Sequence, residues 1–223
     1  LTGSGGPAYL VPGQTTFEPS INTGKELGVK FKPAPRTDLR LAVWRQDATD
    51  EVANMPATGT TVGLGETRRE GVDLQFSTRV FDKFDVWVSH SLQKAEVTKA
   101  FGADGVSLAG KEVFSTPRRI SNAGLDYRHS DRLRFGLQGR AQGSYFVDSP
   151  NQLGKYGGFV LFDASVRYAL SPRVSIDLQV RNLADREYEY AWYDNFFWPA
   201  NQYQPMFSSG PGRSAYLSLN VKM

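Results

Sequence analysis

The residues best suited to binding chemistry are aromatic, and they concentrate near the C-terminal end of the chain. Residues 185–211 hold nine of the 28 aromatic residues in a chain of 223. A segment that exposes so many rings to solvent is unfavourable unless the rings pack together or bind something. Packing against neighbouring loops is the simpler interpretation; capture of a catecholate, macrocyclic or sugar ligand is the functional one. The candidate ligand-contacting residues are Trp192, Tyr193, Phe196, Phe197, Trp198 and Tyr203.

Residue patterns for catalysis and metal binding are missing from the sequence. Without Cys there are no disulfides, no thiol chemistry and no Cys-ligated zinc. The two histidines, His90 and His129, belong to no G-x-S-x-G, H-E-x-x-H or phosphate-loop motif. Acids in 47–66 and 99–117 lack the D-x-D-x-D spacing of a calcium loop, so both segments are interpreted as solvated loops. We therefore expect no enzyme, no cofactor and no metal site.

Polar and apolar residues alternate with a period of two through most of the chain. Because successive side chains of a strand point to opposite faces, each such segment has one apolar and one polar face. Apolar runs long enough for a spanning helix, roughly 18–20 residues, are absent. The alternation predicts an all-β chain with about nine strands, at 24–33, 36–46, 67–81, 83–98, 118–129, 131–147, 159–170, 172–183 and 213–223.

Short and long connections are expected to alternate along the chain. Tight turns are predicted at 33–36, 81–83, 129–131 and 171–173. Long connections are predicted at 47–66, 99–117, 148–158 and 185–212, with residues 1–22 as the tail of another. In an antiparallel up-and-down sheet this puts every short turn at one end, as in transmembrane β-barrels. A soluble β-sandwich or lipocalin-like carrier is the alternative, although its strands are typically only about 5–6 residues long.

Basic residues outnumber acidic ones on the polar face of the predicted strands. If the apolar face contacts lipid, the polar face lines the lumen. Cross-strand ion pairing is the simpler interpretation of these charges. The other is a positive interior that favours anionic solutes or the acidic surface of an enclosed plug. The net charge of +3 gives no reason to expect a nucleic-acid partner. The candidate lumen-facing basic residues are Arg134, Arg140, Arg167 and Arg181.

Five short motifs, taken in order, resemble the TonB-dependent outer-membrane receptors. Residues 182–188, NLADREY, are similar to the family's N-L-x-D-x-x-Y signature. The other four matches are 24–30 to an E-x-G-x-K strand, 65–73 to a G-x-E-x-x-G-[VI]-[ED] strand entry, 161–168 to the strand before the signature, and 211–213 to a closing P-G-R. Each motif is degenerate alone, but their shared order across 24–223 is fairly specific.

The resemblance implies a 22-stranded barrel with a plugged lumen, of which residues 1–223 supply the C-terminal part: residues 1–22 as an extracellular loop tail, 24–223 as strands and loops, and no plug domain. It further implies TonB-dependent import of a ferric siderophore or similar scarce solute. The implied location is the outer membrane of a Gram-negative bacterium, with the C-terminus periplasmic. The implied partners are outer-membrane lipid and lipopolysaccharide, a siderophore-like ligand, and the TonB complex through a missing N-terminal region.

The terminal residue departs from the family pattern, because Met223 stands where such barrels usually end in Phe or Trp. This departure bears on assembly into the membrane, although Met keeps an apolar side chain at the outward position. The alternative function is a small self-contained outer-membrane barrel of about eight to ten strands, a size within the range of such barrels. Such a barrel would act as a passive pore or a structural protein.

Overall fold

The computed structural model describes residues 19–55, 60–102, 105–197 and 202–222. Within these ranges every regular element is a strand, and no helix long and apolar enough to cross a membrane is present. The strands are β1 (Ile21–Ala34), β2 (Thr37–Met55), β3 (Thr60–Val80), β4 (Phe84–Lys99), β5 (Arg119–Arg128), β6 (Leu133–Gln142), β7 (Tyr145–Phe146), β8 (Lys155–Tyr156), β9 (Phe159–Ala169), β10 (Val174–Arg181), β11 (Glu189–Phe197), β12 (Gln202–Ser209) and β13 (Ser214–Val221).

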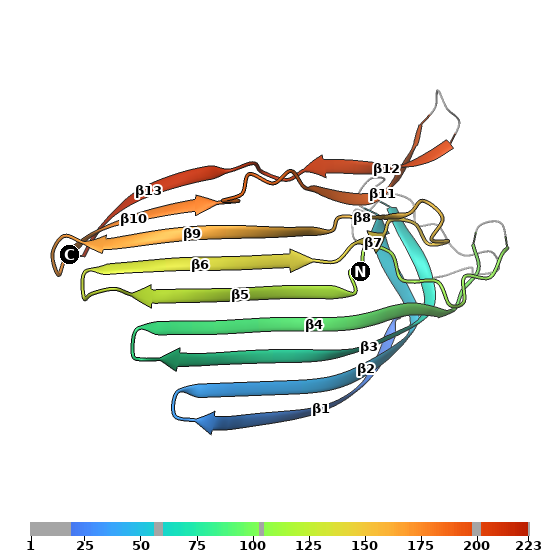
Figure 1. Cartoon of the computed structure of the whole chain (residues 1–223). Helices are drawn as coiled ribbons and strands as arrows, with labels where there is room; N and C mark the ends of the chain where they lie inside the picture. Colours follow the sequence, from blue (N-terminus) through green and yellow to red (C-terminus); the bar gives the residue numbers. More distant parts are fainter. Residues whose placement is uncertain (1–18, 56–59, 103–104, 198–201, 223) are drawn as a thin grey trace.

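Nine of these strands form one antiparallel sheet in the order β1-β2-β3-β4-β5-β6-β9-β10-β13 (Figure 1). The sheet curves, and its tight turns all lie at the end near the C-terminus while the long connections lie at the other (Figure 1). We call these the short-turn end and the long-loop end. The predicted antiparallel up-and-down arrangement is therefore confirmed.

The register gives the sheet one apolar face. Leu27 lies opposite Val43, Val43 opposite Val72, and Val72 opposite Leu92, so one cross-strand row is entirely apolar. Leu27 is 73% exposed and Leu92 is 48% exposed. Water does not favour an apolar surface of this extent, whereas the hydrocarbon of a membrane does. We call the face that carries this row the outer face and the opposite one the inner face.

Tryptophan and glycine are neighbours on the inner face. Trp44 donates from Nε1 to Asp73 Oδ2 at 2.8 Å, and its ring covers Gly71, where an added Cβ would come within 2.7 Å of the ring. Trp87 covers Gly124 in the same way, and an added Cβ there would overlap Nε1 of the ring. Glycine is needed at both positions because a bulky ring occupies the space of its missing side chain.

Three predicted loop segments contain more strand than the sequence suggested. β2 and β3 continue pairing to Met55 and Thr60, so most of the predicted connection 47–66 is a hairpin. The predicted strand 131–147 ends at Gln142, and its last part holds the short strand β7, which pairs with β8 from the predicted connection 148–158. The predicted loop 185–212 holds the β11–β12 hairpin. These extensions pair through the backbone, and the predicted alternation did not include them.

Two clusters of buried apolar side chains lie at the long-loop end of the sheet. One buried cluster contains Leu64, Ala95, Val97, Ala100, Val113 and Phe114, from β3, β4 and the connection after β4. A second contains Tyr145, Val147 and Ala191, with Leu153 and Tyr156 packed against it. The long loops are thus folded structures that bury side chains of their own.

Candidate functional site

The connection between β4 and β5 folds back on the outer end of β4. Val97 N–H donates to the carbonyl of Lys111 at 2.9 Å, and Val113 N–H donates to the carbonyl of Ala95 at 3.0 Å. Val97 and Val113 are both buried, being 2% and 4% exposed. The expectation that 99–117 is a solvated loop is therefore wrong for its second part, because Leu108, Val113 and Phe114 pack in the cluster formed with β3 and β4.

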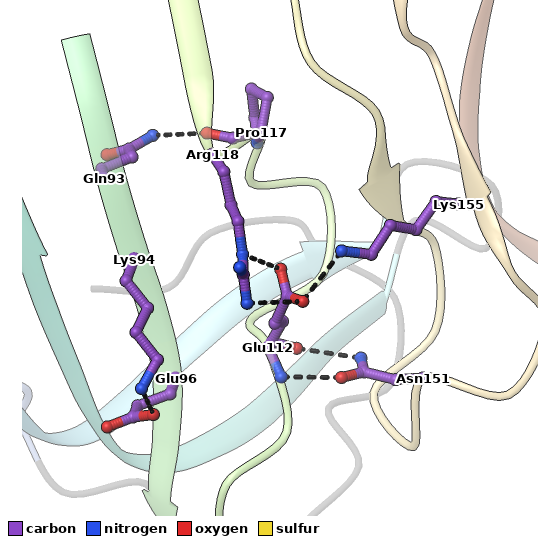
Figure 2. Close-up of polar contacts among 8 residues, drawn as sticks. All are labelled: Gln93, Lys94, Glu96, Glu112, Pro117, Arg118, Asn151 and Lys155. Carbon is purple, nitrogen blue, oxygen red and sulfur yellow. Dashed lines mark hydrogen bonds and ion pairs between the residues drawn. The ribbon is translucent and has the colours of Figure 1, made fainter.

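Glu112 joins this connection to the one between β6 and β9 (Figure 2). Its carboxylate accepts hydrogen bonds from Arg118 Nε and Nη2, each at 3.0 Å, and from Lys155 Nζ at 2.9 Å. The side chain of Glu112 is only 16% exposed. Burial would raise the pKa of this carboxyl, but the hydrogen bonds from Lys155 and Arg118 outweigh burial and lower the pKa below its ordinary value. Glu112 therefore acts as a charged brace between two loops.

Asn151 reinforces the same contact through the backbone of Glu112. It donates from Nδ2 to the Glu112 carbonyl at 3.0 Å and accepts from the Glu112 N–H at Oδ1 at 2.7 Å (Figure 2). Nearby Asp148, which is 2% exposed, accepts from the N–H groups of Gln152 and Leu153 at 2.7 and 3.2 Å. The two loops are consequently held by charged and neutral bonds together.

The β11–β12 hairpin is attached to this assembly at its base. Tyr145 Oη donates to the Ala191 carbonyl at 2.7 Å, inside the second buried cluster. Rings from β9 and from the start of the hairpin also meet: Phe159 lies 5.1 Å from Tyr188 and 5.9 Å from Tyr190, between ring centroids. The β4–β5, β6–β9 and β10–β13 connections thus form one interlocked rim, which we call the loop rim.

Five of the six aromatic residues predicted to contact a ligand belong to the strands of this hairpin. Trp192 pairs with Met206 along the backbone, and Phe196 pairs with Tyr203. Phe197 pairs with Gln202, and Tyr193 lies where the register shifts between Trp192 and Asn195. Trp198 lies outside the described residues, as do the side chains of 192–204. Their contact with a ligand stays a prediction.

An open, mainly polar cleft of about 830 Å3 lies beside the base of the hairpin. Its lining includes Lys155 and Tyr156 from β8, Arg186 and Tyr188 before β11, and Gly210 after β12. This cleft offers both signs of charge and tyrosine rings to a solute at the long-loop end.

The N-L-x-D-x-x-Y and P-G-R motifs meet where β10 ends and β13 begins. Asn182 is 2% exposed, with a φ of +50°, and its side chain bonds the backbone of Arg186 (carbonyl 2.9 Å, N–H 2.9 Å) and the carbonyl of Pro211 (3.2 Å). Asp185 accepts from Arg213 N–H at 2.8 Å. These motif residues hold the base of the hairpin, which is a structural role that explains their spacing.

The four candidate lumen-facing arginines share the inner face. Arg134 lies opposite Arg167, Arg140 lies opposite Leu161, and Arg181 lies opposite Ser214 with its guanidinium carbon 5.0 Å from the centre of the Tyr216 ring. The structure thus brings Arg134 and Arg167 together, while Arg140 and Arg181 are separate. Whether this face encloses a lumen stays a prediction.

The histidines and acids form no catalytic or metal-binding set in the described ranges. His90 Nδ1 lies 2.8 Å from Ser121 Oγ, and His129 Nδ1 lies 3.3 Å from Tyr127 Oη. No group of three or more His, Asp or Glu side chains that could hold a metal ion occurs in this part of the chain. The polar side chains of the loop rim can bind a solute and position it, and their arrangement suits recognition of a ligand.

Sequence reasoning missed Glu112, Tyr145 and Asn151. The Glu112–Asn151 bond joins residues 39 apart, and the Tyr145–Ala191 bond joins residues 46 apart. A single sequence carries no signal for such pairs, because neither residue belongs to a local motif. The only indirect sign was the apolar content of segments interpreted as solvated.

The family model for the TonB-dependent receptor-like β-barrel matches residues 1–183. The chain belongs to this family. A probable TonB-dependent receptor of Bordetella pertussis, BfrD, is 23% identical over 225 aligned residues, covering 96% of this chain and 29% of BfrD. The catecholate siderophore receptor Fiu of Escherichia coli K12 is 26% identical, covering 84% of this chain and 24% of Fiu. The predicted family is therefore confirmed.

Solved structures of the family share the fold. The ferric yersiniabactin uptake receptor FyuA from Yersinia pestis superposes with a TM-score of 0.72 at 20% identity, covering 91% of this chain and 30% of FyuA. The siderophore receptor PiuA from Acinetobacter baumannii gives 0.70 at 20% identity, covering 90% and 28%. The chain therefore spans between about a quarter and a third of the length of these relatives. Family membership places it in the outer membrane of a Gram-negative bacterium.

Proposed function

We propose that the complete protein imports a metal chelate, most directly a ferric siderophore, across the outer membrane with energy from the TonB complex. Within it, this chain supplies nine strands of the barrel wall and the loop rim on the extracellular side, and its C-terminus is periplasmic. The observation that carries the proposal is the match of residues 1–183 to the receptor barrel family. Named relatives support the solute class, because Fiu is a catecholate siderophore receptor and CntO of Pseudomonas aeruginosa a metal–pseudopaline receptor.

The β11–β12 hairpin is the proposed ligand-contacting element of the rim. Its base is held by Tyr145 and by the Phe159, Tyr188 and Tyr190 rings. A rigid base lets the aromatic tip present its rings with little loss of conformational freedom on binding. Flat rings suit the aromatic arms of a catecholate chelate, through stacking and apolar burial.

The test measures both binding and uptake of radioactive ferric tris-catecholate by cells that carry the complete protein. Trp192→Ala with Phe196→Ala should lower binding at least tenfold, because each change removes a stacking surface from the mouth. Leu217→Ala, on the outer face of β13, is the control and should bind normally. Normal binding by the double variant would refute the role of the hairpin. Uptake that continues in cells without TonB would refute active transport and favour a passive pore.

The outer face adds a proposal about lipopolysaccharide. A second cross-strand row on the outer face lies beside the apolar row of Leu27, on the side of the long-loop end. It consists of Lys25, Arg45, Glu70 and Lys94. Its three cations suit the phosphate groups of lipopolysaccharide at the membrane surface. Changing all three to Gln should reduce the number of lipopolysaccharide molecules that native mass spectrometry finds on the purified complete protein. An unchanged number would contradict this contact.

A further inference from the structure

Three arginines lie side by side on the inner face near the short-turn end. Arg128 on β5 is directly opposite Arg134 on β6, and Arg134 is directly opposite Arg167 on β9. Directly opposite residues in an antiparallel pair hold their Cβ atoms about 4.5–5.5 Å apart, and like charges at such positions are destabilising. Arg134 is therefore flanked on both sides by a positively charged side chain.

The two flanking arginines have acidic partners. Arg128 Nη2 donates to Asp85 Oδ2 at 2.7 Å. Arg167 Nη2 donates to Ser175 Oγ at 3.1 Å, and its Nε lies 3.6 Å from Asp177 Oδ1. Both acids are also shared: Asp85 with Arg79 at 2.5 Å, and Asp177 with the amide of Asn220. Neither acid forms an ion pair with the central arginine among the described residues.

The guanidinium group of Arg134 makes no hydrogen bond or ion pair within the described part of the chain. Asp126, the next inner-face residue along β5, forms no ion pair with it there either. Arg134 lines a cleft of about 470 Å3 at the short-turn end. The other charged side chains of that cleft are Arg132, Arg167, Arg173, Lys222 and a single acid, Asp131. This cleft is thus mainly cationic, whereas a second cleft that Arg134 lines, of about 400 Å3, also contains Arg167 and the acids Asp126 and Asp177.

We propose that Arg134 is the docking point for a carboxylate side chain on a segment of the complete protein that lies outside residues 1–223. A guanidinium flanked by two others is a good receptor for a carboxylate, because it offers a planar pair of N–H donors. The opposed arginines repel one another for as long as the sheet is folded. A carboxylate of the same polypeptide can offset this repulsion all of that time, whereas a free solute offsets it only while it is bound. This chain covers 24–30% of its named relatives, which leaves ample polypeptide to supply the partner.

The sign of a stability change tests the proposal without any added solute. With nothing docked, Arg134→Glu would put a carboxylate between Arg128 and Arg167 and would slow heat-induced unfolding. With a carboxylate docked, the same change repels the partner, and unfolding of the purified complete protein becomes several-fold faster. Arg134→Gln should give a smaller acceleration, and Lys83→Glu, an exposed change of the same sign in a turn, should give none. Slower or unchanged unfolding of Arg134→Glu would overturn the proposal.

A second measurement identifies the partner directly. Arg134→Lys places an amine at the site that a carbodiimide can join to a neighbouring carboxylate, and wild-type Arg134 is the unreactive control. Peptide mapping should recover the introduced amine joined to an Asp or Glu outside this chain; a link to Asp126 alone, or none, would contradict the docking. If the stability difference appears only when citrate or phosphate is added, the site takes a free anion and the proposal is wrong. These two tests measure unfolding and cross-linking, so their outcome does not depend on whether hairpin variants lose iron uptake.

Discussion

Tyr145 and Ala191 are joined by two hydrogen bonds through one hydroxyl group. The Tyr145 hydroxyl donates to the Ala191 carbonyl at 2.7 Å and accepts from the Ala191 N–H at 3.3 Å, and the two residues are only 6% and 2% exposed. A single side chain in the β6–β9 connection therefore satisfies both backbone groups at a buried position of β11. This hydroxyl is therefore one of the attachments of the hairpin, beside the ring contacts of Phe159 with Tyr188 and Tyr190.

Tyr145→Phe should loosen the hairpin without disturbing the sheet. The change keeps the ring but leaves two buried backbone groups unsatisfied, at a cost of about 1–3 kcal/mol. Hydrogen exchange should become faster at residues 189–193 of the complete protein, while exchange in β5 and β6 stays as in the wild type. Tyr127→Phe, which removes a hydroxyl contact with His129, is the matched control. Equal exchange in Tyr145→Phe and wild type would show that the ring alone holds the hairpin.

Asn182→Ala and Asn182→Gly should separate side-chain bonding from backbone conformation. Both lose the bonds to Arg186 and Pro211, for about 1–3 kcal/mol. Only Ala adds the strain of the positive φ, roughly 1–2 kcal/mol, because glycine adopts that conformation freely. The amount of folded barrel, measured by heat-modifiable gel migration, should fall in the order wild type, Gly, Ala. A Gly variant as stable as the wild type would show that the hydrogen bonds of the Asn182 side chain do not contribute to stability.

Gly124→Ala should destabilise the sheet through the ring of Trp87. The new Cβ would overlap Nε1 of that ring, and such overpacking costs about 1–3 kcal/mol. Trp87→Leu should restore much of the stability in the double variant, so that the two changes are not additive. Gly28→Ala, whose Cβ would have an ordinary 3.5 Å contact, is the control. Midpoints of heat-induced unfolding for the four variants provide the measurement, and strictly additive effects would contradict the contact.

Acidification should release the Glu112 brace. Because the folded state lowers the pKa of Glu112, its contribution is fully present above the ordinary value near 4.5 and is lost as the pH falls through the lower folded pKa. The charged groups around it are Arg118, Lys155 and the Lys94–Glu96 pair on β4 (Figure 2). Hydrogen exchange of residues 108–114 should therefore accelerate on moving from pH 7 to below pH 4, after correction for intrinsic rates.

The matched variant for this acid effect is Glu112→Gln. It keeps the shape of the side chain and its backbone bonds to Asn151, but it lacks the titrating charge. Its loop should exchange faster than the wild type at pH 7, and the difference should shrink at low pH. If the wild type and Glu112→Gln show the same pH dependence, another carboxylate controls the loop.

The sheet could be predicted from the sequence, and the loop rim could not. Within the sheet most strand positions follow one physical rule, apolar outward and polar inward, so the alternation in residues 160–170 predicts a strand. The contacts of Glu112 and Tyr145 follow no periodic rule, since Glu112 bonds Lys155, 43 residues away, and Tyr145 bonds Ala191, 46 residues away. The aromatic segment was recognised by composition, but composition did not distinguish a paired hairpin from an irregular loop.

β1 and β13 each have only one neighbour in the described sheet, at its two edges. All 14 residues of β1 are exposed, and its backbone groups on the free side are a template for another strand. A polypeptide limited to these residues would therefore be prone to self-association, two copies adding strand to strand as growing fibrils do. If residues 1–223 are produced alone and prove insoluble, the unpaired edges of β1 and β13 are sufficient to explain it.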